Sequence, residues 1–289
     1  MRKIFMWKTL FSYIVFIVIT HHSSTLQAAE TGLQHGYECV RCDLQGKDFQ
    51  QLNLAHANLQ ETVLMTSNLH QANLTQANLS RADLRGADLS RAVLTAAILT
   101  HADLRRVELS NAQLSHAQLM QADLSDADLT AAVLTKANLQ QADLKNAQLE
   151  NIKASLAIFT AADLRNALLT KADLRGANFT QAKMSESNLE NTQLSWAILQ
   201  KADLRGAFLT NADLRRANLR EADLRGADLQ KADLREADLT DANLNKTNLQ
   251  DALFSRESDI QKARLQGANL QGACFAITVA DKPQWSCIR

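Results

Sequence analysis

A period of five residues runs through most of this chain. Between Leu44 and Phe254, every fifth residue is Leu, Phe or Met at 42 of 43 consecutive positions. The residue two places earlier is usually small, since 33 of the 40 such positions from 57 to 252 are Ala. The one exception among these central positions is Ala154, and Ile152 stands two places before it. The large and the small side chain are therefore expected to have exchanged places in a packed interior.

This period fits neither of the ordinary elements of secondary structure. On an α-helix, five residues rotate a side chain by about 500°, which would scatter the leucines around the axis. On a flat strand, an odd period would send alternate leucines to opposite faces. The pattern requires a backbone that turns by about a quarter circle in each unit, so that four units close one coil. The sequence therefore predicts a solenoid whose coils stack at the strand spacing of ~4.8 Å, with the Leu and Ala side chains inside.

The repeated unit reads A-(D/N)-L-x-x, as at residues 82–86, 122–126 and 222–226. In this unit, which covers about three quarters of the chain, the sequence resembles the pentapeptide-repeat family. The resemblance implies an all-β fold, namely a right-handed quadrilateral β-helix of about twelve coils. It implies much less about activity. A quinolone-resistance subgroup of the family acts on DNA gyrase as a mimic of duplex DNA, and several of its members carry projecting loops. No insertion interrupts the period here between residues 44 and 254.

Four parts are expected along the chain. They are a signal peptide at 1–29, an N-terminal cap segment at 30–43, the solenoid at 44–275 and a C-terminal cap at 276–289. After Phe254 the period resumes one residue late, at Ile260, which places an extra residue within 255–259. A bulge at a corner of the coil is the expected cause.

The first residues are typical of a secretory signal peptide. Basic residues precede an apolar run from Thr9 to Thr20, and a polar stretch follows it. The run is shorter than the ~20 residues that span a bilayer, which favours cleavage after Ala28 or Ala29 over a retained anchor. The chain is therefore expected to be exported, to the periplasm or outside the cell, with no transmembrane segment in the mature protein.

Four cysteines flank the repeats, with Cys39 and Cys42 before them and Cys274 and Cys287 after them. Coils stacked at ~4.8 Å place the two ends more than ~50 Å apart, far beyond the ~7 Å between Cα atoms that a disulfide can bridge. In an exported chain, this favours a disulfide within each pair as a staple at each end. Free thiols, or redox or metal chemistry at the C-x-x-C sequence, are the alternatives.

The outside of the solenoid is expected to be ordered as well, because residues 20 apart stack in columns. One face carries a column of basic residues, and an aspartate stands two places before each of them. The basic residues are Arg85, Arg105, Lys145, Arg165, Arg205 and Arg225. We interpret this charged face as a solvated ladder of ion pairs, each of which contributes little to stability. The alternative is an extended binding stripe for a partner with a matching pattern of charge.

The net charge argues against nucleic acid as a partner and against DNA mimicry. The chain has 31 basic and 31 acidic residues, and three of the basic ones lie in the signal peptide, which leaves a net charge of −3 (28 minus 31). A DNA duplex as long as the solenoid carries roughly thirty charges, at about one per ~1.7 Å. Export and the lack of projecting loops point the same way.

A few outward positions are apolar. Trp196, Ile198 and Phe208 are close in sequence, and we interpret them as an interaction patch for a protein partner or for a homodimer. The alternative is that they are scattered surface residues of the ordinary kind.

Nothing in the sequence indicates catalysis, a cofactor or a metal site. Four histidines, His56, His70, His101 and His116, occupy outward positions of separate units without ligand spacing. The predicted function is that of a non-catalytic, exported scaffold, either structural or binding an unknown protein partner. The first alternative is a DNA-mimicking modulator of a type II topoisomerase, and an enzyme ranks third.

Overall fold

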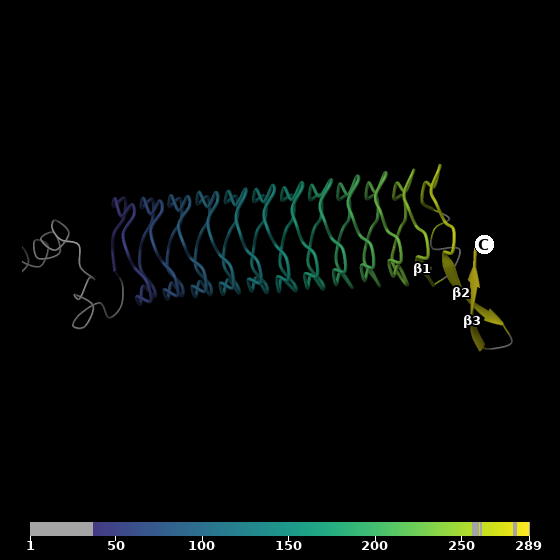
Figure 1. Ribbon diagram of the computed structural model, residues 1–289, viewed down its shortest axis with the longest axis horizontal. Helices are drawn as coiled ribbons and strands as arrows, with labels where there is room; N and C mark the ends of the chain where they lie inside the picture. The colour runs from purple at the N-terminus through teal and green to yellow at the C-terminus, as the bar shows by residue number, and fades with distance from the viewer. Residues whose placement is uncertain (1–36, 256–259, 261, 280–281, 289) are drawn as a thin grey trace, which may run out of the picture. The chain divides into compact units, whose positions relative to one another are not determined.

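The backbone winds into a solenoid in which each coil contains four of the five-residue units. The computed structural model describes residues 37–255, 260, 262–279 and 282–288. Parallel bridges join residues 20 apart along the solenoid, from Glu38 with Asn58 to Asp233 with Leu253. The coils stack side by side along one axis (Figure 1). The predicted signal peptide and residues 30–36 of the N-terminal cap segment lie outside the described residues.

Units that carry Asp or Asn before the central residue satisfy all of their backbone N–H groups, as the unit at 83–87 illustrates. Three of them donate to carbonyl groups of neighbouring coils at 2.8–3.1 Å. The N–H of Asp83 donates to Thr62, that of Leu84 to Asp103, and that of Gly86 to Arg105. The N–H of Ala87 closes a turn to Leu84 at 3.0 Å. The fifth N–H, of Arg85, donates to the side chain of Asp83 at 3.3 Å. The Asp or Asn of the repeat therefore caps the turn.

Every unit turns through a left-handed residue. The second residue after the central one has a positive φ in each unit from Arg41 to Asp251. Together with the hydrogen bond across the turn, this corresponds to a type II turn, which requires a positive φ at its third residue. Only five of these positions are Gly, and one is the β-branched Thr66, at φ 53°. Nothing in the repeat pattern indicated this conformation.

The predicted interior is confirmed by burial. The central side chains from Leu59 to Phe254 are at most 1% exposed, and Ile152 and Ala154 are both fully buried. Phe159 stacks on Phe179 in the next coil, with ring centroids 4.7 Å apart. At the small position, Thr or Ser hydroxyls donate to backbone carbonyl groups, so that these buried polar groups are satisfied. The five are Thr62, Ser67, Ser187, Thr192 and Thr247.

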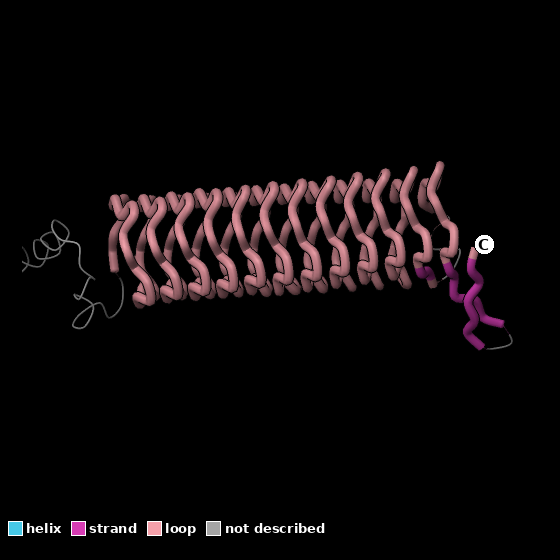
Figure 2. The backbone as a smooth tube through the Cα atoms, in the orientation of Figure 1, coloured by secondary structure: helices cyan, strands magenta, loops and turns pink. Residues whose placement is uncertain are grey.

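The one-residue shift after Phe254 is present in the structure. Bridges there join residues 21 apart, as in Asn243 with Arg264. Residues 256–259, where most of the predicted bulge falls, lie outside the described residues. Strand β1 (Leu253–Phe254) pairs in parallel with β2 (Cys274–Val279), and β2 pairs antiparallel with β3 (Lys282–Cys287). Strand β2 crosses the boundary expected at 275/276, and the β2–β3 hairpin projects from the last coil (Figure 2).

Candidate functional site

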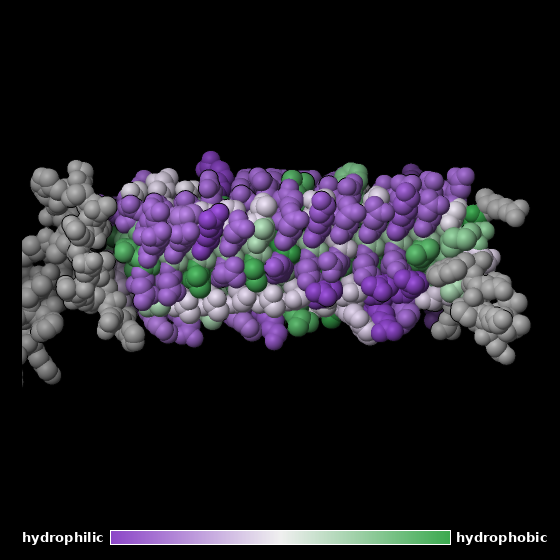
Figure 3. Space-filling view, turned by 60° about the horizontal axis from the view of Figure 1, so that its bottom comes forward, coloured by the Kyte–Doolittle hydropathy of each residue, from purple (hydrophilic) through white to green (hydrophobic). Residues whose placement is uncertain are grey.

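The candidate functional surfaces are the four outward sides of the coils. We number these sides by their central residues, so that the first side contains Leu84 and the residues 20 apart from it. The second, third and fourth sides are those of Leu89, Leu94 and Leu99. Sides that are ten residues apart along the chain, which is half a coil, lie opposite each other. Figure 3 shows rows of hydrophilic side chains along the coils, with isolated hydrophobic residues between them.

The predicted charged face lies on the first side. The guanidinium of Arg85 bonds the carboxylate of Asp83 in its own unit, with its terminal nitrogen 2.6 Å from Oδ2. Its Nε also lies 3.5 Å from Asp103 in the next coil. Arg105, Lys145 and Arg205 bridge two coils in the same way, whereas Arg165 and Arg225 pair with the aspartate of their own unit. The basic side chains are thus bound within the protein along this side.

A second ladder occupies the opposite, third side and was missed in the sequence. It pairs Arg175, Arg215 and Arg235 with Asp173, Asp213 and Asp233. The nitrogen Nε of Arg215 also reaches Asp233 of the next coil, at 3.7 Å. The signal was available, because the letters A-D-L-R occur at 172–175, 212–215 and 232–235. Two opposite sides of the solenoid therefore carry compensated charge.

The ladders perturb the titration of their carboxylates. The hydrogen bond from Arg205 holds the pKa of Asp203 below its usual value, against the opposing effect of partial burial. The pKa values of Asp173 and Asp213 are lowered in the same way by Arg175 and Arg215. Because the arginine side chains are about half exposed, these pairs are of the kind that contributes little each.

The arrangement closest to catalytic chemistry lies on the second side. The Nδ1 atom of His70 lies 2.7 Å from the hydroxyl of Ser90 in the next coil. That hydroxyl donates to Asp88 at 2.5 Å, so the imidazole must act as the donor to the serine oxygen. In a nucleophilic triad the carboxylate instead orients the imidazole, which accepts the serine proton. These residues form a polar ladder. Among the residues that the structure describes, no three His, Cys, Asp or Glu side chains are grouped to hold a metal ion.

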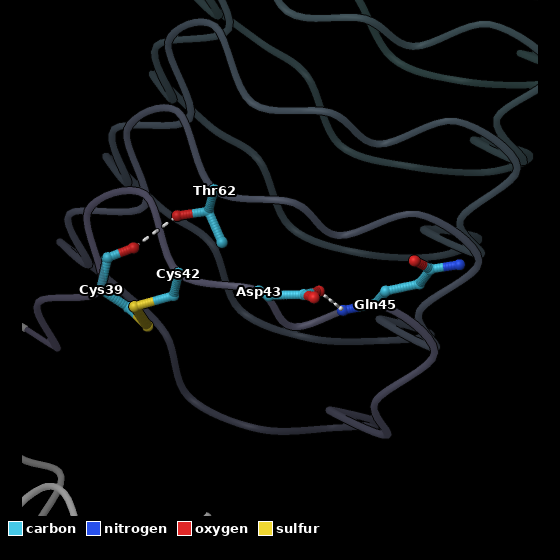
Figure 4. Close-up of a disulfide and its surroundings, with 5 residues drawn as sticks. All are labelled: Cys39, Cys42, Asp43, Gln45 and Thr62. Carbon is cyan, nitrogen blue, oxygen red and sulfur yellow. Dashed lines mark hydrogen bonds between the residues drawn. A yellow bond between two sulfur atoms is a disulfide. The ribbon is translucent and has the colours of Figure 1, made fainter.

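The structure contains both of the disulfides that the sequence favoured. Cys39 is joined to Cys42, and Cys274 to Cys287 across the β2–β3 pair. Cys39 occupies the column of the central leucines and is buried. Its carbonyl accepts a hydrogen bond of 2.5 Å from Thr62 in the next coil (Figure 4). The first disulfide thus closes a turn at the start of the described coils.

The predicted apolar patch is wrong in one of its three members. Phe208 lies on the second side, whereas Ile198 lies on the opposite, fourth side, because ten residues make half a coil. Trp196 stands at the corner between the third and fourth sides, beside Ile198. The three side chains therefore do not form one surface, although all of them are exposed.

Trp196 instead belongs to a column of corner residues. The guanidinium carbon of Arg216, in the next coil, lies 4.6 Å from the centre of the indole ring, and Arg216 in turn bonds Glu236 at 2.7 Å. In the other direction the column continues through Gly176 to Leu156, which is also exposed. Among the described residues, the two most exposed large apolar side chains, Trp196 and Leu156, both lie at this corner.

Among the described residues there is no helix with the length and hydropathy that a membrane span requires.

No curated protein matches this sequence. Solved structures of several proteins are similar to it, including HetL, Rfr23 and QnrB1. HetL, involved in heterocyst differentiation regulation in the cyanobacterium Nostoc, is 31% identical, with 82% of this chain and 90% of HetL covered and a TM-score of 0.47.

The other two are more distant or shorter. Rfr23 from the cyanobacterium Cyanothece is 32% identical over 35% of this chain and 58% of its own, with a TM-score of 0.24. QnrB1, a plasmid-mediated fluoroquinolone resistance protein, is 17% identical, with 81% of this chain and 92% of its own covered and a TM-score of 0.22.

The family itself is established by sequence. A family model described as pentapeptide repeats (8 copies) matches overlapping segments that together run from residue 39 to residue 275. This range contains all of the coils described above and implies the right-handed β-helix that the repeat unit suggested. The chain is a member of the pentapeptide-repeat family.

Proposed function

We propose that this chain is an exported, non-catalytic scaffold that binds a protein partner along the outside of its solenoid. The observation that carries the proposal is the fixed order of the outward side chains. Ladders of hydrogen bonds and ion pairs join residues 20 apart, as in Gln51 with Gln71 and Arg41 with Glu61. A surface whose side chains are already held in place loses little conformational entropy when a partner binds.

The length of the solenoid adds to this argument. About twelve coils at ~4.8 Å make a rod of more than ~50 Å, which offers a partner a long and regular surface. The charged ladders favour a partner with a complementary alternation of charge, because their acidic and basic columns largely cancel at a distance. The exposed apolar corner at Trp196 favours a direct protein contact.

Export is supported by the N-terminal sequence and by the cysteines. The basic and apolar stretches before residue 21 are typical of a signal peptide. All four cysteines are placed in disulfides, which persist in oxidising compartments. A fusion of residues 1–30 to a reporter that is active only outside the cytoplasm tests this step. Reporter activity confined to the cytoplasm would overturn it.

Binding is tested with the purified mature protein as bait in the exported fraction. We expect a partner that is retained by the wild type and lost from a variant of one side only, such as Arg85→Glu with Arg105→Glu on the first side. The matched control reverses the charge at two positions on the opposite side, with Arg215→Glu and Arg235→Glu. A protein that is retained equally by both variants, or no retained protein, contradicts specific binding to a charged side.

Modulation of a type II topoisomerase is the alternative function. The ladders argue against it, because the acidic columns of the first and third sides are neutralised by the arginines beside them. A supercoiling assay with the mature protein separates the two functions. Inhibition at stoichiometric concentration would favour the topoisomerase and reverse our ranking.

A further inference from the structure

The exposed apolar residues of the corner lie in two pairs. Leu156 and Ile158 form one pair, with exposed fractions of 54% and 37%, and Trp196 and Ile198 form the other, with 60% and 38%. The two pairs are two coils apart, since Ile158 is bridged to Asn178 and Asn178 to Ile198. We call the outward residues of the corner and the fourth side between positions 155 and 200 the corner surface.

The corner surface is almost free of charge. Its only charged residue is Arg175, which is bonded to Asp173 at 2.7 Å. Charged residues of the same corner column begin one coil beyond it at each end, with Lys136 and Arg216. An apolar centre that contains an aromatic residue, is depleted of charge and has a charged rim is the composition of protein interfaces.

The corner surface is also approximately symmetric. Leu156 and Trp196 lie one coil on either side of Gly176, and the two isoleucines lie one coil on either side of Asn178. A twofold axis through Gly176 and Asn178, perpendicular to the rod, would exchange the two pairs. Homodimer interfaces of this kind use the same patch on both subunits and must be complementary to themselves.

We propose that two copies of this chain associate side by side and antiparallel through the corner surface. In this arrangement Trp196 contacts the partner's Leu156, and Ile198 contacts the partner's Ile158. Gly176 has no side chain to hold the two copies apart. Asn178 of one copy faces Asn178 of the other, and an amide side chain carries both a donor and an acceptor for such a pair. The inference goes beyond the proposed function and does not depend on any other partner.

The antiparallel arrangement places apolar residues opposite apolar residues, whereas a parallel one with the fourth sides centred on each other does not. With the rods parallel, Trp196 would face the other corner of the fourth side, where the same coil carries Lys201. With the rods antiparallel, Lys136 faces the partner's Arg216, whose charge is compensated by a carboxylate, since Arg216 bonds Glu236.

The size of the corner surface sets the strength of the dimer. The corner surface spans three coils, and with the charged rim one coil beyond it at each end, five coils at ~4.8 Å give a contact about 24 Å long on one side of a narrow rod. Such a contact is at the lower end of the size range of specific interfaces, which predicts a weak dimer. The association must therefore be measured over a range of protein concentrations that reaches well above the micromolar level.

The register is tested by disulfide trapping in the purified mature protein. The native cysteines are already paired, so an added cysteine supplies the only free thiol among the described residues. We expect Asn178→Cys to form a covalent dimer on mild oxidation. Asn138→Cys and Asn218→Cys, in the same column two coils away, should each remain monomeric alone and cross-link when mixed. Equal cross-linking of all three single variants, or none at Asn178→Cys, overturns the proposal.

The surface is tested by sedimentation equilibrium. We expect Trp196→Arg to weaken the dimer by at least ~10-fold, because aromatic residues at the centre of an interface dominate its affinity. Phe208→Arg, on the opposite side, is the matched control and should leave association unchanged. The circular dichroism spectra of both variants should match that of the wild type. A wild type that is monomeric at all concentrations overturns the dimer while leaving the proposed function untouched, as does dissociation by Phe208→Arg alone.

Discussion

The side chain of Leu156 lies across the bare backbone of Gly176, one coil further along, with its Cδ2 atom 2.9 Å from the place where a Cβ of residue 176 would stand. The missing side chain thus lets an exposed leucine extend along the rod towards Trp196. The contact joins two coils of the corner surface, which gives Gly176 a role beyond the turn that it occupies.

This contact predicts different effects for two glycine substitutions. Gly176 and Gly226 both have positive φ, at 65° and 70°, but a Cβ at 226 would meet no atom within 4 Å. We expect Gly176→Ala and Gly226→Ala each to lower the free energy of unfolding by about 1 kcal/mol, from the backbone conformation. Only Gly176→Ala must displace Leu156, so only it should weaken self-association in sedimentation equilibrium. Equal association of the two variants would contradict the role of Leu156.

The left-handed turn residues predict a stabilising substitution. Thr66 is β-branched and has φ 53°, which is costly for such a side chain. We expect Thr66→Gly to raise the free energy of unfolding by about 1 kcal/mol in urea denaturation. The matched control is Thr95→Gly, at the preceding position of a turn, where φ is not positive and Gly should be destabilising. A loss of stability in Thr66→Gly would show that its side-chain contacts outweigh the backbone strain.

The exchanged pair in the interior predicts a compensating double substitution. Ile152 and Ala154 are both fully buried. Ile152→Ala alone should cost about 2–5 kcal/mol through a cavity, and Ala154→Leu alone about 1–3 kcal/mol through overpacking. The double variant restores the usual Ala and Leu of the repeat and should recover most of both losses. Additive losses, measured by denaturation of all four proteins, would show that the two positions do not share one volume.

The charged ladders predict a dependence of stability on pH. The pKa of Asp203 is lowered in the folded protein by the hydrogen bond from Arg205. Its contribution is therefore complete above the unfolded pKa of ~3.9 and is lost as the pH falls through the lower, folded value. Arg205→Gln should lower stability at pH 7 by less than about 1 kcal/mol, and the difference should vanish in acid or high salt. A difference that grows below pH 4 would contradict this sign.

The sequence predicted the inside of this protein better than its outside. Leucine and alanine recur, as at Leu84 and Ala82, because a packed interior accepts one large and one small side chain per unit. The period alone therefore identifies the buried residues and the shift after Phe254. Outward residues face water and are under no such constraint. Some of their contacts join residues in different coils, so the bond between His70 and Ser90, which are 20 residues apart, appears only when the coils are stacked.

The position of Phe208 shows the same difference. It is ten residues from Ile198, and closeness in sequence suggested one patch, but half a coil places the two on opposite sides. The left-handed turns were missed for another reason. Most of these turn positions are occupied by residues such as Gln, Lys and His, which do not mark a positive φ in a sequence. The hydrogen bonds to the neighbouring coils hold the backbone in that conformation.

In the proposed function, the outside of the rod binds a protein partner after export. A photo-crosslinking residue on each side of the exported protein, at Lys183, Gln148, Gln113 and Gln140, all of which are exposed, tests this binding. We expect a covalent adduct with one other protein at one or two neighbouring sides and none at the rest. Recovery of the protein from the exported fraction without an adduct at any of the four positions would contradict it.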